Sequence, residues 1–265
     1  MKPYKNRIVV KVGTSTLTNE LGNNNLLSFN KISCVLSDIS NLGYQVILVS
    51  SGAIAVGMNK LNIKQLPINM RMKQAAAAVG QSSIMSLYDN FFSMYNKTVG
   101  QILLNAEDIH SEEKKENLIN TFDALLEKDI IPIVNENDSV SYTEIESEER
   151  LFGDNDMLSA VVAVLCRANK LIILSDIDGV FETDPRLYPN AKLISRIEEI
   201  NEETIQLAGG AGSRRGTGGM KTKIKAAQLA TSQGIDTIIT NGAIPESLYN
   251  IVNGKEIGTL FVGKK

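Results

Sequence analysis

The amino-acid sequence predicts an α/β protein in which a mainly parallel β-sheet is covered by helices on both faces. Short runs of β-branched and aliphatic residues alternate along the chain with longer segments whose apolar residues recur at helical spacing. The composition, 43% hydrophobic and 22% charged, is ordinary for a globular protein with a sizeable core. No low-complexity linker or fixed repeat divides the 265 residues, so we expect one domain.

The first half of the chain begins with a predicted strand over residues 7–13, because RIVVKVG is a β-branched run that ends in glycine. Residues 27–43 predict a helix, since apolar side chains recur at helical spacing before a glycine stop. The run YQVILVSSG predicts a second strand over residues 44–52. The same patterns predict a long helix over 69–95, a strand over 98–104 and a helix over 112–128.

The second half continues this alternation. DIIPIVNEND predicts a strand over residues 129–138 that runs into a polar loop. NDMLSAVVAVLCRAN predicts a helix over 155–169, and KLIILSD predicts a strand over 170–176. The remaining predicted elements are a helix over 220–233, a strand over 234–240 and a final strand over 259–263.

Polar residues and glycines follow several predicted strands at the point where each strand ends. In an open parallel sheet the carboxyl ends of the strands share one edge, and ligands bind beyond that edge. We therefore expect these segments to converge on one site. They are residues 11–14, 50–52, 135–138 and 175–176.

Several classes of protein are disfavoured by the sequence. The net charge of −3 argues against general nucleic-acid binding. No run of apolar residues is long enough to span a membrane or to form a signal peptide, so we expect a cytoplasmic protein. Cys34 and Cys166 have no metal-site or disulfide spacing and are expected to be buried thiols. The single histidine, His110, lies in a polar context and is expected at the surface.

The segment AGGAGSRRGTGGMKTKIKAAQLA, residues 208–230, combines six glycines with a following helix that carries three lysines. Bare backbone N–H groups before a helix N-terminus form an anion site, and the lysines add full positive charges. Neither the Walker A pattern nor the dinucleotide fingerprint is present. Phosphate binding is therefore the favoured interpretation, and a surface loop without a ligand is the alternative.

Lys11 interrupts an apolar strand in KVGTSTLT, which is unusual unless its ammonium group reaches a partner; the alternative is an edge-strand lysine that points to solvent. VNENDSV, residues 134–140, and FGDNDMLSA, residues 152–160, place amides and carboxylates where elements join. One residue of the run Asp154, Asn155 and Asp156 is expected to cap a helix, but a cap does not need three polar residues.

The strand end in LSDIDGVFETDPR, residues 174–186, suits a turn that faces a ligand, although an ordinary turn with a hairpin behind it explains these residues equally well. The acidic run EIESEER, residues 144–150, is interpreted as a solvated loop.

Two distant lysines, a phosphate-binding loop and the lack of a well-placed imidazole base favour phosphoryl transfer to a carboxylate. A carboxylate is already an anionic nucleophile, so no proton has to be removed. The barrier is then largely the repulsion between two anions, which positive charge and positioning can lower.

Taken together, KVGTSTLT, VSSGAIAVG, NENDSV, FGDNDMLSA and GTGGMKTKIKAA resemble, in order and spacing, the motifs of the amino acid kinase family. The resemblance runs over essentially the whole chain. It implies a three-layer αβα sandwich around a mainly parallel sheet of about eight strands. It also implies a single domain, 1–265, with an N-terminal lobe for the amino acid and a nucleotide lobe from about residue 170. Many relatives carry a C-terminal PUA domain, and its expected absence here is a departure from them.

The resemblance also assigns roles to residues. It implies that Lys11 and Lys223 contact the transferring phosphate from two sides and that Asp156 organises both lysines. The substrate-binding residues that it implies are Ser51, Gly52, Asn135, Asp138, Asp154 and Asn155. The nucleotide-binding residues that it implies are Lys11, Gly13, Ser175, Asp176, Thr217, Gly218, Gly219, Met220, Lys221, Thr222 and Lys223.

Within the family, NENDSV and FGDND resemble members that transfer the γ-phosphate of ATP to the side-chain carboxylate of L-glutamate, the first step of proline synthesis. Such members imply Mg²⁺ held mainly by the ATP phosphates, proline as an inhibitor, a homodimer or tetramer, and glutamyl phosphate reductase as a partner. The alternatives are a kinase for aspartate, N-acetylglutamate, carbamate or UMP, and a nucleotide-binding module without catalysis. Two further departures are the acidic run at 144–150 and Ser175, where the family pattern has threonine.

Overall fold

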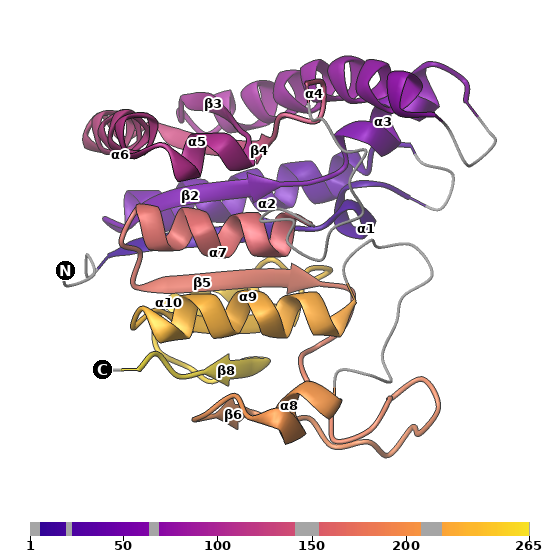
Figure 1. Ribbon diagram of the computed structural model, residues 1–265, viewed down its shortest axis with the longest axis vertical. Helices are drawn as coiled ribbons and strands as arrows, with labels where there is room; N and C mark the ends of the chain where they lie inside the picture. The colour runs from indigo at the N-terminus through magenta and orange to yellow at the C-terminus, as the bar shows by residue number, and fades with distance from the viewer. Residues whose placement is uncertain (1–5, 20–22, 64–68, 141–153, 208–218, 265) are drawn as a thin grey trace.

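The computed structural model describes residues 6–19, 23–63, 69–140, 154–207 and 219–264. Within these residues one eight-stranded sheet runs through the molecule, in the order β3-β4-β2-β1-β5-β7-β8-β6 (Figure 1). The strands are β1 (Arg7–Val12), β2 (Gln45–Ser50), β3 (Val99–Leu104), β4 (Ile131–Glu136), β5 (Lys170–Ser175), β6 (Arg196–Ile197), β7 (Asp236–Asn241) and β8 (Thr259–Phe261).

Helices connect the strands of this sheet. The described helices are α1 (Thr14–Leu17), α2 (Leu26–Asn41), α3 (Ala53–Lys60), α4 (Met70–Ser93), α5 (Ala106–His110), α6 (Glu112–Glu127), α7 (Asn155–Leu165), α8 (Glu202–Leu207), α9 (Met220–Ser232) and α10 (Ser247–Val252). The predicted αβα sandwich with a mainly parallel sheet is confirmed. The exception is β8, which pairs antiparallel with β7.

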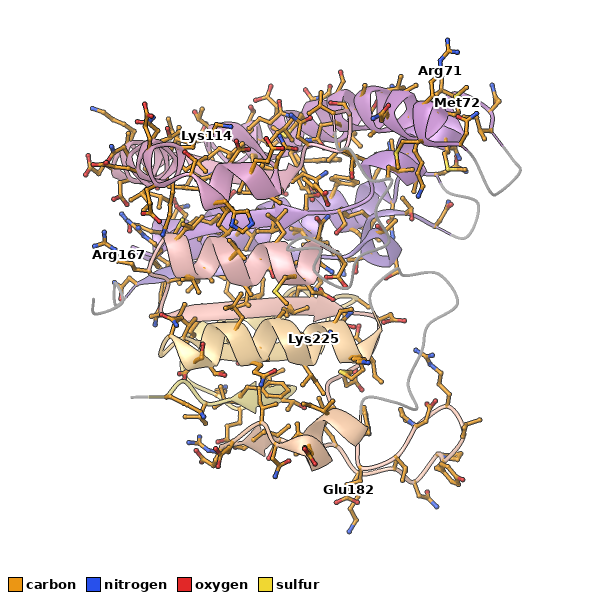
Figure 2. The ribbon with its side chains drawn as sticks, viewed as in Figure 1. Arg71, Met72, Lys114, Arg167, Glu182 and Lys225 are labelled. Carbon is orange, nitrogen blue, oxygen red and sulfur yellow. The ribbon has the colours of Figure 1, made fainter. Side chains whose placement is uncertain are left out.

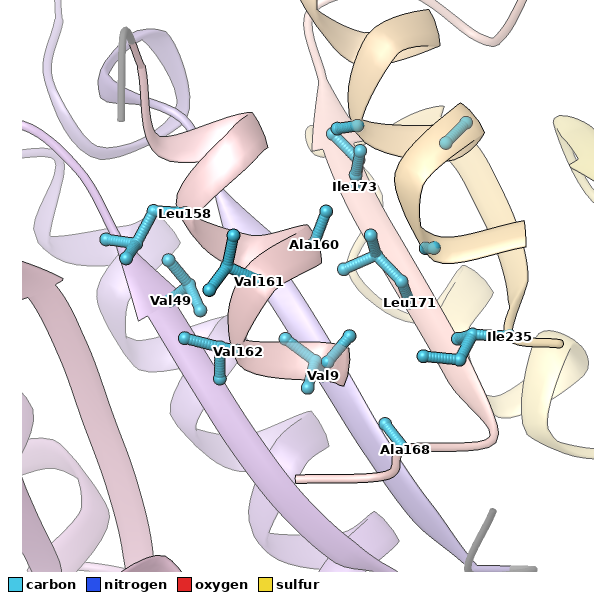
Figure 3. Packing of buried hydrophobic residues seen from close by; sticks show 14 of the residues in the cluster. Val9, Val49, Leu158, Ala160, Val161, Val162, Ala168, Leu171, Ile173 and Ile235 are labelled. Atoms are coloured by element: carbon cyan, nitrogen blue, oxygen red, sulfur yellow. The ribbon is translucent and has the colours of Figure 1, made fainter. Parts of the chain in front are cut away.

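Two hydrophobic cores lie on opposite faces of the sheet. On one face, α6, α7 and α9 cover the strands, and Val161 and Val162 of α7 lie over Val9 of β1 and Val49 of β2 (Figure 3). On the other face, the core includes residues of α2, α4 and α10. Because neighbouring residues of a strand point to opposite faces, Val9 belongs to the first core and its neighbours Ile8 and Val10 belong to the second.

The strand register brings the expected polar segments to one edge. β1 pairs in parallel with both β2 and β5, so that Lys11 lies opposite Val49 and Ile173. β4 lies on the far side of β2 and runs in the same direction. The carboxyl ends of these strands therefore share one edge, at the right of Figure 1, where the arrows of β2 and β5 point. Arg167 marks the opposite edge, at the left of Figure 2.

The structure corrects some of the expected boundaries. The helix expected over residues 155–169 ends at Leu165, because Arg167 adopts a left-handed conformation with φ of 51° and turns the chain into β5. The short elements α1, α3, α5, β6, α8 and α10 were not predicted, since each is too short to give a clear periodic pattern.

The expectations for the cysteines and the histidine have mixed outcomes. Cys166 is buried, as expected, but Cys34 is only half-buried, because it lies at the boundary of the apolar face of α2. Both thiols are free. His110 is exposed at the end of α5, which confirms its place at the surface. In the part of the chain that the structure describes, no helix is both long and apolar enough to cross a membrane.

Candidate active site

Lys11 lies in the middle of the sheet, not at its edge. Its strand β1 has neighbours on both sides, and the Lys11 side chain is 8% exposed. Because Lys11 and Val9 share one face of the strand, the Lys11 side chain projects toward α7 and α9. The solvent-facing alternative for Lys11 is therefore wrong.

Asp156 is the partner that Lys11 reaches. The distance from Lys11 Nζ to Asp156 Oδ1 is 2.6 Å, and the Asp156 side chain is 1% exposed. Asp154 precedes it as the N-cap of α7 and accepts hydrogen bonds from the backbone N–H groups of Asp156 and Met157 through Oδ1, at 2.9 and 3.1 Å. Because Asp154 forms the cap, Asp156 is left to extend its carboxylate toward the sheet.

Lys223 binds the second oxygen of the same carboxylate. Its Nζ lies 3.0 Å from Asp156 Oδ2, and its side chain is 9% exposed. The Thr222 hydroxyl lies 3.2 Å from Asp156 Oδ2, and it donates a hydrogen bond to the Gly219 carbonyl oxygen at 2.9 Å. Asp156 therefore bridges two lysines that come from the first strand and from a helix near the C-terminus. We call Lys11, Asp156 and Lys223 the lysine clamp.

The charge state of Asp156 follows from two opposing effects. Burial alone raises the pKa of its carboxyl group, because a charged group loses solvation. The charges of Lys11 and Lys223, and the hydrogen bonds that they donate, outweigh burial and hold the pKa of Asp156 below its ordinary value of 3.8. The clamp therefore carries one negative and two positive charges at neutral pH, a net positive charge at a buried position.

A chain of amides lies beside the clamp, at the ends of β2 and β4. The Asn155 Nδ2 group donates to the Ser50 carbonyl and to Ser51 Oγ, both at 2.9 Å, and lies 3.0 Å from Asn135 Oδ1. Asn135 Nδ2 in turn donates to Gln81 Oε1 at 2.8 Å. The predicted substrate residues Ser51, Asn135 and Asn155 are thus brought together. We call Ser51, Asn135, Asn155 and Gln81 the amide chain.

Two glycines keep this edge of the sheet open. A Cβ atom on Gly13 would lie 3.5 Å from Lys11 Nζ, an ordinary van der Waals distance, so a side chain there would occupy space beside the ammonium group. Gly52 is the N-cap of α3 and has φ of 97°, a left-handed conformation that other residues rarely adopt. Glycine at these positions allows close approach to Lys11 and a sharp turn after Ser51.

The remaining predicted substrate residues are Asp138 and Asp154. Asp138 is partly buried in the turn that follows β4. The Oδ2 atom of Asp154 is buried and has no hydrogen-bond partner within the described residues. The acidic run at 144–150 lies outside the described residues.

The predicted nucleotide residues divide into three groups. Ser175 is buried at the end of β5 and donates to Asp176, which is also 3.5 Å from Arg186 Nη2. At the start of α9, Met220 is buried, whereas Lys221 is exposed. Thr217 and Gly218 lie outside the described residues, and so does most of the glycine-rich segment.

Sequence reasoning missed two residues at this edge of the sheet. Gln81 and Tyr88 of α4 reach Asn135 and Ser50, respectively. Neither α4 residue belongs to a motif, and Ser50 was noted only as a strand end. The one available signal was the spacing of seven residues between Gln81 and Tyr88, which places them on one face of a helix.

The fold and the clamp define the class of protein. The strand ends of the mainly parallel sheet present a buried, net positive clamp beside polar amides. The molecule is therefore an α/β protein with a site for anionic ligands. The sequence matches the model of the amino acid kinase family over residues 6–241, and the chain belongs to that family.

Individual relatives agree with this assignment. A glutamate 5-kinase from Clostridium perfringens (strain 13 / Type A) is 55% identical over 259 residues, which cover 98% of this chain and 96% of that protein. A glutamate 5-kinase from Clostridium acetobutylicum is 51% identical over 262 residues, 98% of this chain and 95% of that protein. The solved carbamate kinase from Giardia lamblia bound to AMP-PNP is only 14% identical, but superposes with a TM-score of 0.68 over 97% of this chain and 98% of its own. That similarity concerns the fold alone.

Proposed function

We propose that this chain is a glutamate 5-kinase, which transfers the γ-phosphate of ATP to the side-chain carboxylate of L-glutamate and forms L-glutamyl 5-phosphate, the first step of proline synthesis. The observation that carries the proposal is the lysine clamp beside the amide chain. Relatives that share about half of the sequence over nearly its full length, and that are named glutamate 5-kinase, support the choice of acceptor.

In the proposed mechanism, a carboxylate oxygen of glutamate attacks the γ-phosphorus, and the bond from that phosphorus to the β–γ bridging oxygen breaks to release ADP. Lys11 and Lys223 neutralise the charge of the transferring group from two sides. Asp156 remains ionised and holds both lysines in place. No described residue has to remove a proton, because the nucleophile is already an anion.

The amide chain and the turn after β4 are proposed to hold glutamate. Ser51, Asn135 and Asn155 supply neutral hydrogen-bonding groups, and Gly52 allows the backbone to approach the ligand. Asp138 and Asp154 are acceptors suited to the α-ammonium group. The Oδ2 atom of Asp154 has no hydrogen-bond partner within the described residues, which supports that role. These residues all precede position 170, so the proposal places the amino acid on an N-terminal lobe.

The nucleotide is proposed to lie over the C-terminal half, near Ser175, Asp176 and the start of α9. The described residues contain no group of three or more His, Cys, Asp or Glu side chains placed to hold a metal ion. Both oxygens of Asp156 already contact lysines. The family resemblance is the basis for proposing that Mg²⁺ enters with the ATP phosphates, so that MgATP is the substrate.

Three further properties are proposed on the relatives' name and on the family resemblance. Proline is an inhibitor that competes with glutamate, the enzyme is a homodimer or tetramer, and glutamyl phosphate reductase takes over the labile product.

A substrate panel tests the proposed function. Purified protein is incubated with MgATP and hydroxylamine, which traps an acyl phosphate as its hydroxamate. The acceptors are L-glutamate, L-aspartate and N-acetyl-L-glutamate, each with and without proline. We expect hydroxamate from L-glutamate only, and less of it in the presence of proline. Product from another acid, or from none, would contradict the proposal.

A further inference from the structure

Helix α4 sends two side chains to the edge of the sheet that carries the amide chain. Gln81 and Tyr88 are seven residues apart, which is about two helical turns, so both lie on one face of α4. Gln81 Oε1 accepts from Asn135 Nδ2 of β4 at 2.8 Å. The Tyr88 and Ser50 hydroxyls lie 3.0 Å apart. One helix therefore supports the ends of β2 and β4 together.

The direction of every hydrogen bond in the amide chain is fixed by one backbone carbonyl. The Ser50 carbonyl can only accept, so the Asn155 atom beside it must be Nδ2. That same Nδ2 faces Asn135, which must therefore present Oδ1. Asn135 Nδ2 then points the other way, toward Gln81, which must present Oε1. Only an acceptor at position 81 is compatible with this sequence of bonds.

This direction determines which hydrogens remain for a ligand. Ser51 Oγ accepts from Asn155, so the Ser51 hydroxyl hydrogen is left to donate elsewhere. Gln81 uses its oxygen for Asn135, and its Nε2 group donates to no partner within the described residues. Donors at both ends of the chain suit a carboxylate, which only accepts hydrogen bonds.

The burial of these side chains separates positioning from packing. Tyr88 is fully buried and packs against Phe29 and Phe92, so its loss would disturb the core. Asn135 is 2% exposed, and its Nδ2 therefore needs a partner. Gln81 is only half-buried, and its contribution to the core is small. Its side-chain oxygen accepts the hydrogen bond that holds the Asn135 amide.

We propose that Gln81 is a positioning residue for the carboxylate substrate. Gln81 acts through Asn135 and keeps the amide chain oriented with its hydrogen-bond donors toward the substrate carboxylate. This inference rests on the proposed function and names a residue of the same site. Without an acceptor at position 81, the Asn135 amide can turn over and place its Nδ2 against that of Asn155. The substrate would then meet a site with the wrong hydrogen-bonding polarity.

The test measures the KM for L-glutamate, the KM for ATP and kcat for Gln81→Met, which keeps the length and helix propensity of the side chain but removes the acceptor. We expect the KM for L-glutamate to rise about tenfold, the value of one lost hydrogen bond to a charged ligand. The KM for ATP and kcat should change much less. Gln81→Leu is a second variant without an acceptor, and Ser82→Ala, one residue away on the exposed face, is the control.

A double-mutant cycle distinguishes positioning from a general structural effect. If Gln81 acts through Asn135, the effect of Gln81→Met on the KM for L-glutamate should vanish in an Asn135→Ala background. Unchanged KM in both Gln81 variants, or independent effects of the two substitutions, would overturn the inference while leaving the proposed function intact. A wild-type protein that does not phosphorylate L-glutamate would contradict both.

Discussion

Asp156 shows how a single residue links the stability of this protein to its proposed chemistry. Burial of a carboxylate or an ammonium group is costly unless the charges are paired with good geometry. Here one buried carboxylate meets two nearly buried lysines, at 2.6 and 3.0 Å. The three groups are stable only as a set, and the set retains a net positive charge where a phosphate is proposed to react.

The first prediction concerns the pH dependence of stability. At pH 7, Asp156→Asn should lower the free energy of unfolding by about 3 kcal/mol, because it leaves two buried lysines without their counter-charge. The pKa of Asp156 is lowered in the folded protein, so its contribution is complete above the ordinary value of 3.8 and is lost as the pH falls through the lowered pKa. The difference in the free energy of unfolding between wild type and variant should therefore be constant from pH 7 to about 5. It should become smaller below pH 3.8.

Denaturant unfolding of both proteins across this pH range measures the effect. Glu246→Gln removes a carboxylate whose ion pair with Lys31, at 3.4 Å, is exposed, and should change stability by less than about 1 kcal/mol. If the difference in the free energy of unfolding between wild type and Asp156→Asn already became smaller near pH 6, burial would outweigh the lysine charges and the pKa of Asp156 would be raised. That result would contradict the prediction.

The sequence allowed some residues of the site to be predicted and not others. Lys11 could be predicted because a charge in an apolar strand needs a partner. The run from Asp154 to Asp156 could be predicted because a helix cap needs only one of these three polar residues. Gln81 could not be predicted, since its role depends on which strand ends lie beneath α4. The bond from Thr222 to Asp156 depends in the same way on tertiary structure.

At the scale of elements, the site depends on the close approach of α3 and α4. A Cβ atom on Gly80 of α4 would lie 1.8 Å from the Ala53 carbonyl oxygen of α3, and one on Gly57 would lie 1.7 Å from the Ala76 carbonyl oxygen. The two helices therefore pack backbone against backbone. This contact holds the start of α3, and with it Gly52 and Ser51, against the helix that carries Gln81.

The second prediction tests this contact. Glycine to alanine within a helix normally stabilises it by about 1 kcal/mol. Gly80→Ala should instead lower the free energy of unfolding by about 1–3 kcal/mol, because the new methyl group overlaps backbone atoms that cannot move independently.

Urea unfolding measures this change, with Ser86→Ala on the exposed side of α4 as the control, for which we expect a change of a few tenths of a kcal/mol. A stabilised Gly80→Ala would show that the two helices are not in close contact.

The elements themselves were predicted in proportion to their length. The long helix over 69–95 and the hydrophobic strands were predicted with small boundary shifts, because their periodicity spans many residues. The helix α3 was not predicted, since its eight residues come immediately after a strand and a turn at a glycine. The antiparallel direction of β8 was not predicted either, because an apolar run does not encode its pairing direction.

At the scale of the whole molecule, the strand order assembles the clamp. β1 lies between β2 and β5, so the chain first extends the sheet to one side and then crosses over to build the other side. Ligands bind at such a reversal of strand order in open α/β sheets. The first turn of α7 carries Asp156 to this point, and the first turn of α9 brings Lys223 beside it. Residues near the two ends of the chain therefore meet only in the complete fold.

The measurement that tests the central claim most directly is the turnover of L-glutamate by Lys223→Ala, together with its dissociation constant for ATP. The control is Lys225→Ala, since Lys225 lies on the exposed side of the same helix (Figure 2). If the charge of Lys223 acts mainly in the transition state, kcat should fall by about a hundredfold or more, whereas ATP binding should weaken far less. Lys225→Ala should behave like wild type. An unchanged kcat in Lys223→Ala would contradict the proposed role of the lysine clamp in phosphoryl transfer.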